Sequence, residues 1–200
     1  MNIEQTVRHG TNSISTEQQE LYCRYQSGDS IKDAAESLVS GIQPGPGRLN
    51  YIYTVAAFVK NNITYEDTGS FPQQAAYTLE TAQSGNCVDQ SVLVMSLFEA
   101  LDIDARYCCY VWDTEEVGHC LIEVRVPTAD SHPSRVERRL AQKADIRGRL
   151  AYDLDHGSAW LLVDPTTSLA IGFERGPAYT VHENGIRWNQ DTNVVCFSPV

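Results

Sequence analysis

Residues 87–101 read CVDQSVLVMSLFEAL, the clearest single indication of how this chain folds. Apolar side chains recur around most of the circumference of the helix that this segment would form. That pattern is typical of a helix buried in the centre of a domain. The turn-forming residues Gln83-Ser84-Gly85-Asn86 stand directly before it. We therefore expect a domain built around a central helix that begins at Cys87.

Three segments after this helix have the aromatic and β-branched content of strands, and a short acidic turn over 113–116 predicts that the first two form a hairpin. These segments are residues 107–112 (YCCYVW), 119–126 (HCLIEVRV) and 160–164 (WLLVD). Weaker strand signals lie near 170–174, 178–182 and 193–198. Strands of this kind predict an antiparallel sheet for the central helix to pack on.

Two more helices are expected before the central one. The first runs from Ser30, as its N-cap, to about Gly41, and the second covers about 48–62. The sequence Gln-Pro-Gly-Pro-Gly at 43–47 separates them, and 73–82 is expected to be a loop with one helical turn. The fold class predicted is α+β, with a buried helix on an antiparallel sheet and extra N-terminal helices.

The chain has 200 residues, the size of one domain with an appendage. Residues 1–28 are polar and are predicted to form an N-terminal arm containing one helix, and 29–200 form the domain proper. A basic excursion is expected at 127–158, since residues 135–149 hold four more basic than acidic side chains. One interpretation of this excursion is a solvated helix. The other is a functional segment, which would be a docking surface or a lid over a neighbouring cleft.

The net charge is −11, from 15 basic and 26 acidic residues. Nucleic-acid binding is therefore not expected, because affinity for phosphates comes mainly from Lys and Arg. Only three of the basic residues are lysines. Acid excess with Arg in place of Lys fits a protein of a salty, halophile cytoplasm, where carboxylates keep a surface hydrated, but genome base composition explains the Arg bias equally well.

No apolar run is long enough to span a bilayer, and the first 20 residues lack the apolar core of a signal peptide. The sequence therefore predicts a cytoplasmic protein, or a component of a larger assembly, without membrane contact. Its six cysteines are too sparse and irregular for a disulfide framework, which favours a reducing compartment.

Cys87 is the first candidate for chemistry, because the start of a helix favours the thiolate form and offers N–H groups to an oxyanion. A lone cysteine at this place is more often a small core residue. His119 begins a strand and could act as its base, and Asp164 ends another strand and could orient the imidazole. The three residues together are stronger evidence than each alone.

The segments 85–106 (GNCVDQSVLVMSLFEALDIDAR), 118–124 (GHCLIEV) and 160–166 (WLLVDPT) resemble the three signature blocks of the transglutaminase-like superfamily of papain-related cysteine enzymes. The resemblance covers about residues 30–166. It implies a papain-like core in which Cys87 is the nucleophile, His119 the base and Asp164 its orienting partner.

The same resemblance implies that Asp89 is a structural hydrogen-bonding residue, and that the hydroxyl of Tyr65 is a candidate second oxyanion donor, with simple core packing as its alternative. Leu121 departs from the aromatic residue that the family often has two positions after the histidine. This departure and the long excursion bear on the substrate groove, but neither removes a member of the triad.

Metal binding has weaker support. Cys108 and Cys109 are adjacent in a strand and point to opposite faces, so they cannot jointly hold one ion. A zinc site of Cys87, Cys120 and His119 is arithmetically conceivable, although Cys120 is expected to pack inward, away from His119. We expect no cofactor and no metal.

The function expected is hydrolysis of an amide bond (peptidase or amidase), or acyl transfer, through a thioester on Cys87. The partner expected is a peptide or protein amide substrate. The alternative is a non-catalytic structural or interaction module of the same fold within a larger assembly. The arm 1–28 or the excursion 127–158 could then contact a protein partner.

Overall fold

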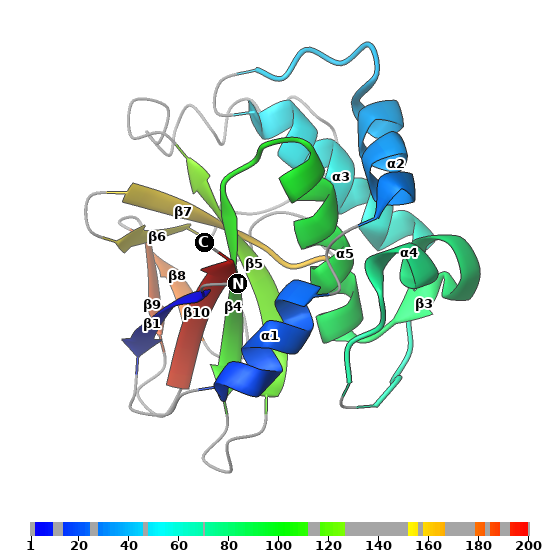
Figure 1. The fold of residues 1–200 in the computed structure, drawn as a ribbon. Coiled ribbons are helices and arrows are strands. Elements are labelled where there is room, and N and C mark those ends of the chain that lie inside the picture. The colour runs from blue at the N-terminus through cyan, green and yellow to red at the C-terminus, as the bar shows by residue number, and fades with distance from the viewer. Residues whose placement is uncertain are drawn as a thin grey trace.

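The computed structural model describes residues 3–9, 14–24, 28–45, 48–69, 71–111, 117–126, 152–155, 158–166, 179–182, 185–188 and 193–199. Its helices gather on one side and its sheet on the other, with the central helix α5 between them (Figure 1). This is the α+β arrangement that the sequence predicts.

Six of the described strands form an antiparallel sheet in the order β1-β10-β4-β5-β7-β6. Their bounds are Ile3–His9 (β1), Asn193–Pro199 (β10), Ala105–Val111 (β4), Val117–Val126 (β5), Ser158–Val163 (β7) and Tyr152–Asp155 (β6). Strands β4 and β5 pair directly, so the predicted hairpin is confirmed. Strands β8 (Tyr179–His182) and β9 (Gly185–Trp188) form a separate hairpin.

Helix α5 (Cys87–Ala100) begins at the residue that the sequence indicated, and every residue from Cys87 to Phe98 is buried. One face packs on β4 and β5, and the other packs against α2 (Asp29–Val39) and α3 (Leu49–Asn62). Because helices and sheet enclose it on both sides, an apolar surface all round is what this position requires. The central-helix prediction is confirmed.

The N-cap predicted for α2 is wrong. Helix α2 begins at Asp29, and its N-cap is Gly28 in an extended conformation with no side-chain cap, so Ser30 already lies inside the helix. The acidic side chain of Asp29 in the first turn favours this earlier start, because the helix N-terminus carries partial positive charge.

The first 28 residues contain more regular structure than the sequence indicated. Helix α1 (Thr16–Arg24) is the expected helix, but β1 was not predicted and extends the sheet by pairing with β10. Tyr22 of α1 is fully buried against Tyr107 and Phe197. The division of the chain at residue 28 stays a prediction.

Residues 127–150 of the basic excursion, and the strand expected near 170–174, lie outside the described residues. The later part of the excursion holds β6 and the start of β7. Within the part of the chain that the structure covers, no helix is long and apolar enough to cross a membrane.

The segment between α3 and α5 carries the chain to the start of the central helix. Strand β2 (Thr64–Tyr65) pairs in parallel with β3 (Ser84–Gly85), and between them lie α4 (Ala75–Tyr77) and a wider helical turn, η2 (Thr78–Ala82). Tyr65 is thereby paired with Gly85, two residues before Cys87.

One pair of cysteines corrects the expectation from composition. Cys109 of β4 and Cys120 of β5 face each other across the hairpin and form a disulfide. Although the cysteines are sparse along the chain, strand pairing brings these two together, which spacing in the sequence alone does not reveal. Cys108 points to the opposite face of the sheet, as predicted.

Candidate active site

Cys87 is the first residue of α5 and is held there by a reciprocal cap. The side-chain oxygen of Asn86 accepts hydrogen bonds from the N–H groups of Val88 at 2.9 Å and Asp89 at 3.2 Å. The Asp89 carboxylate accepts in return from the Asn86 N–H at 3.0 Å. This capping box fixes where the helix begins and therefore where the cysteine stands.

Asp89 also binds the loop that precedes the helix. Its carboxylate accepts from the Gln73 N–H at 2.7 Å, from the Gln73 side-chain amide at 3.1 Å and from the Thr68 hydroxyl. Asp89 is fully buried, so these donors compensate its charge. The structural role expected for Asp89 is confirmed.

Gly85 allows this packing, because a Cβ atom at that position would lie 2.5 Å from the Asp89 Cβ. The side-chain amide of Asn86 adds a further anchor by donating to the Gly69 carbonyl at 2.9 Å. Residues 68, 69 and 73 of the preceding loop are thus hydrogen-bonded to residues on both sides of Cys87.

The cap changes which N–H groups an oxyanion could use. The N–H groups of Val88 and Asp89 are already occupied by Asn86. Among the described residues, no backbone hydrogen bond from the Cys87 N–H is found. The sequence predicts several N–H donors at the helix start, whereas this geometry leaves the N–H of the cysteine itself.

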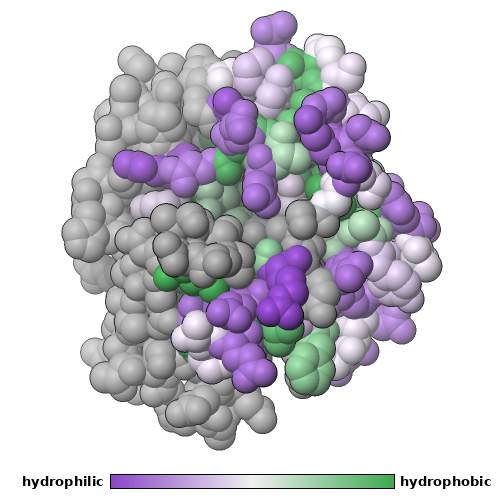
Figure 2. Space-filling view, in the orientation of Figure 1, coloured by the Kyte–Doolittle hydropathy of each residue, from purple (hydrophilic) through white to green (hydrophobic). Residues whose placement is uncertain are grey.

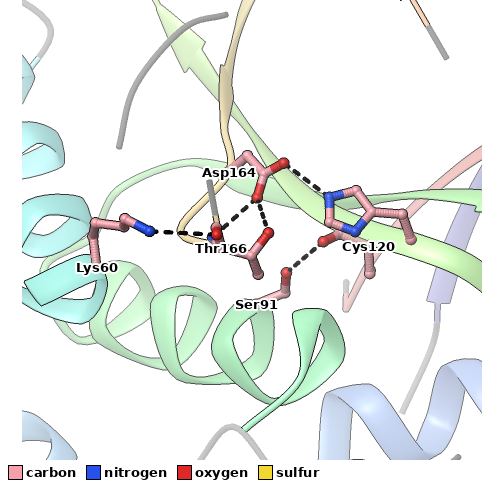
Figure 3. A network of polar contacts seen from close by, with 6 residues as sticks. Lys60, Ser91, Cys120, Asp164 and Thr166 are labelled. Carbon is pink, nitrogen blue, oxygen red and sulfur yellow. Dashed lines mark hydrogen bonds and ion pairs between the residues drawn. The ribbon is translucent and has the colours of Figure 1, made fainter. Parts of the chain in front are cut away.

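His119 on β5 and Asp164, directly after β7, meet as the sequence predicts. The His119 Nε2 lies 2.8 Å from the Asp164 Oδ2. The other carboxylate oxygen accepts from the N–H of Thr166 at 3.0 Å and from its hydroxyl at 2.7 Å. Lys60 of α3 donates to the Thr166 carbonyl at 3.4 Å, and Figure 3 shows these contacts around Asp164. The carboxylate is therefore held in one orientation.

Cys87 belongs to the same contact network, because its side chain hydrogen-bonds with His119. Burial alone lowers the pKa of His119, but hydrogen bonds to Asp164 and to Cys87, together with their negative charges, raise the pKa to about 10. The structure thus brings the three predicted residues together. Their catalytic roles stay predictions, because contact does not demonstrate turnover.

A side-chain contact that sequence reasoning missed joins the two elements carrying Cys87 and His119. Ser91 of α5 donates to the backbone carbonyl of Cys120 at 3.1 Å, as Figure 3 shows. Ser91 is buried and lies one helical turn after Cys87, while Cys120 follows His119. The only sequence signal for it was a serine inside a largely apolar helix.

Tyr65 stands at the edge of the site with 58% of its surface exposed. Partial burial raises the pKa of its hydroxyl, and negative charge at Cys87, Asp67 and Asp164 raises it further. Tyr65 therefore lies within electrostatic reach of the cysteine and the carboxylate. Its exposure disagrees with the simple core-packing alternative, and its part in an oxyanion site stays a prediction.

Tyr22 is a second tyrosine near the site, and local sequence patterns did not predict this proximity. Burial raises the pKa of Tyr22 above its usual range, and negative charge at Cys87 adds to the effect. Its backbone carbonyl accepts from the Tyr107 hydroxyl at 3.4 Å. Helix α1 thus contributes to the surroundings of the cysteine.

The alternative zinc site is wrong. Cys120 is bonded to Cys109, so its sulfur is not a thiolate that could bind an ion beside Cys87 and His119.

These features define an α+β protein with a cysteine, a histidine and a carboxylate grouped at the start of its central helix. The family model of the transglutaminase-like superfamily matches residues 32–165, and the chain belongs to that superfamily. The matched region contains Cys87, His119 and Asp164.

Two solved structures resemble the chain distantly. One is a candidate cysteine protease from Cytophaga hutchinsonii, with 15% identity, a TM-score of 0.44, and coverage of 93% of this chain and 54% of that one. The other is a candidate protease from Parabacteroides distasonis ATCC 8503, with 13% identity, a TM-score of 0.46, and coverage of 78% and 30%. This chain matches about half and about a third of their lengths. No curated protein matches it.

Proposed function

We propose that this protein is a cysteine-dependent amide-bond hydrolase, a peptidase or amidase, that works through a thioester on Cys87. The observation that carries the proposal is the contact of His119 with both Asp164 and Cys87. A partly buried imidazole between a carboxylate and a thiol is the arrangement that a cysteine nucleophile needs, because the imidazole must accept one proton and later deliver it.

The first half of the reaction forms the thioester. The Cys87 sulfur attacks the amide carbonyl while His119 holds the thiol proton, and the Cys87 N–H donates to the developing oxyanion. The Tyr65 hydroxyl is the proposed second donor. Collapse of the tetrahedral intermediate breaks the C–N bond, and His119 protonates the departing amine.

The second half frees the enzyme. His119 takes a proton from water while the water oxygen attacks the thioester carbonyl. The C–S bond then breaks, which releases the carboxylic acid and returns the Cys87 sulfur to its starting state. A primary amine in place of water would give acyl transfer by the same steps. Asp164 orients the imidazole and stabilises the imidazolium, as the carboxylate does in related triads.

Access to the sulfur limits which amides fit. Cys87 is 9% exposed, so a carbonyl must reach it from one side. Tyr65 and Phe71 are exposed aromatic side chains in the segment that is hydrogen-bonded to the start of α5. We infer that a peptide or protein amide lies across this edge, where aromatic surface offers it contact.

The test is to trap the thioester. Wild type is mixed with a panel of peptide coumarin amides and with an activated acyl ester, and intact mass is followed. We expect one acyl adduct on Cys87, none in Cys87→Ala, and an unchanged adduct in Cys23→Ala as the matched loss of a free buried cysteine. Turnover that persists in Cys87→Ala contradicts the proposal. A folded wild type that no ester acylates supports the structural-module alternative.

The products formed when the acyl adduct on Cys87 decays distinguish hydrolysis from acyl transfer. The decay of this adduct is measured in buffer alone and with added methylamine. If the product is mainly acid while methylamine is in excess, the protein is a hydrolase. If amide product dominates at low amine concentration, acyl transfer is the activity.

A further inference from the structure

Two cysteines outside the candidate active site lie against each other inside the sheet. Cys108 of β4 and Cys196 of β10 are directly opposite in the register of the two strands. Their sulfur atoms are 3.1 Å apart, and the residues are 0% and 1% exposed. The proposed reaction uses neither thiol.

The neighbouring pair provides a direct comparison within the same strand. Cys109 follows Cys108 in β4 and is opposite Cys120 of β5, and that pair is a disulfide. Both pairs join directly opposed residues of antiparallel strands, one on each face of the sheet. A disulfide needs sulfur atoms about 2.05 Å apart, so Cys108 and Cys196 need to approach by only about 1 Å.

A metal ion is the competing occupant, because Cys108, Cys196 and Glu123 place their ligand atoms within 4.8 Å of one another. Two thiolates on one zinc ion lie about 3.8 Å apart, from the usual Zn–S distance and tetrahedral angle. The observed separation of 3.1 Å is shorter. The geometry of the two sulfur atoms therefore favours a bond over a bridging ion.

The charge around Glu123 also disfavours an ion. Its Oε2 accepts from the Arg106 Nε at 2.8 Å and lies 2.7 Å from the Arg106 Nη2. The Trp160 ring lies 3.8 Å from this guanidinium. Glu123 is already neutralised by a buried cation, and a divalent ion beside that cation would meet electrostatic repulsion.

We propose that Cys108 and Cys196 form a second cross-strand disulfide, which with the first links β10, β4 and β5 covalently through adjacent residues of β4. The oxidant is a small-molecule disulfide. One thiolate attacks it, a mixed disulfide forms and one thiol leaves. The second thiolate then attacks the protein sulfur of the mixed disulfide, and the second thiol leaves with the two electrons.

Burial sets when this bond forms. Burial and the neighbouring thiol raise the pKa of Cys108 well above its usual value, so the folded dithiol yields little thiolate. The exchange therefore takes place while β10 is unpaired, during folding or opening. Once formed, the bond fixes the C-terminal strand, and β1 with it, to the centre of the sheet.

The experiment counts thiols after refolding. Reduced, denatured wild type is refolded with a mixture of oxidised and reduced glutathione, alkylated in denaturant, and weighed intact. We expect four of the six cysteines to resist alkylation, with any glutathione adduct on Cys87 recognised by its mass. Two protected cysteines only, or zinc that copurifies in a 1:1 ratio and protects Cys108 and Cys196 until chelation, overturns the proposal.

A variant isolates the new bond. The chain with Cys87→Ala, Cys109→Ala and Cys120→Ala keeps Cys23, Cys108 and Cys196. Oxidative refolding should protect two of these three, and adding Cys196→Ala should abolish protection. The melting temperature of the oxidised form should exceed that of the reduced form by about 10 °C, because the bond closes a long loop. If the variant does not fold, the wild-type count alone decides.

Discussion

Asp164 contacts His119 with one carboxylate oxygen and Thr166 with the other, so its charge and its orientation are fixed together. At the scale of single residues, the proposed chemistry depends on this carboxylate. Without its hydrogen bond and charge, two of the contributions that raise the pKa of His119 against the effect of burial would be lost. The imidazolium would then be harder to form beside the Cys87 sulfur.

Substitutions of Asp164 distinguish the effect of its charge on His119 from the effect of its hydrogen bond. Asp164→Asn keeps an oxygen for hydrogen bonding and removes the charge, so we expect the alkaline limit of the kcat/KM profile to move to lower pH and kcat/KM to fall by about 100-fold. Asp164→Ala should lose more. Asp104→Asn, an exposed carboxylate, is the control. An unchanged pH profile in Asp164→Asn would argue against the assigned role.

The raised pKa of His119 should also make the free energy of unfolding depend on pH. Its folded pKa is about 10, above the unfolded value of 6.5, so the folded state holds the proton more tightly. This contribution is fully present below about pH 6.5 and is lost as the pH rises towards 10, with a slope of at most about 1.4 kcal/mol per pH unit. The difference in unfolding free energy between wild type and His119→Gln, from urea titrations, should shrink across that window. A difference that grows with pH contradicts the raised pKa.

At the scale of elements, α5 and β5 must keep a fixed distance for the proposed reaction, since α5 carries the proposed nucleophile and β5 carries the histidine. The Ser91 hydroxyl bridges them by donating to the Cys120 carbonyl. The disulfide of Cys120 with Cys109 fixes the same point of β5 to β4. The strand is therefore held from two sides at the residue after His119.

A second buried serine on the same helix provides a matched control. Ser96 donates to the Val92 carbonyl of its own helix at 2.8 Å. We expect Ser91→Ala and Ser96→Ala each to cost about 1 kcal/mol of stability. Only Ser91→Ala should lower kcat, by about tenfold, with KM little changed, because it alone loosens the contact between the two elements. Equal kcat in both variants would show that Ser91 has no positioning role.

At the scale of the whole molecule, the net charge of −11 is the dominant feature. Hydrophilic side chains cover much of the described part of the face in Figure 2, with smaller hydrophobic patches between them. Like charges at this density repel one another in the folded state, and salt screens that repulsion.

Salt dependence of stability distinguishes screening from adaptation to a salty cytoplasm. Screening should be complete by about 0.5 M KCl, where the Debye length is only a few Å. If the acidic surface is an adaptation, the melting temperature should continue to rise, by about 10 °C or more, up to molar KCl. A melting temperature that does not change with KCl concentration would contradict the hypothesis of adaptation to salt.

The sequence predicted those parts of the fold and the site that local patterns encode. The apolar circumference of 87–101 indicated the buried helix, and its cysteine start and the strands bearing His119 and Asp164 were readable in the same way. The residues of the proposed triad could therefore be named before the structure, from three blocks of local sequence.

What the sequence did not reveal depends on contacts between distant segments. Strand β1 is polar, and it joins the sheet by pairing with β10 at the other end of the chain. Tyr22 comes near Cys87 because α1 packs on the sheet, and Ser91 acts through a carbonyl 29 residues away. Tertiary pairing of this kind leaves no periodic signal in the segment itself.

The central claim is that Cys87 and His119 form a reactive pair. The most direct test is the rate of iodoacetamide labelling of each cysteine against pH, by peptide mass spectrometry, in wild type and in His119→Ala. We predict that Cys87 labels faster than every other free cysteine well below the ordinary thiol range of about pH 8.5, and that His119→Ala removes this advantage. If Cys87 labels no faster than Cys23 at any pH, or keeps its advantage without His119, the pair does not exist as described.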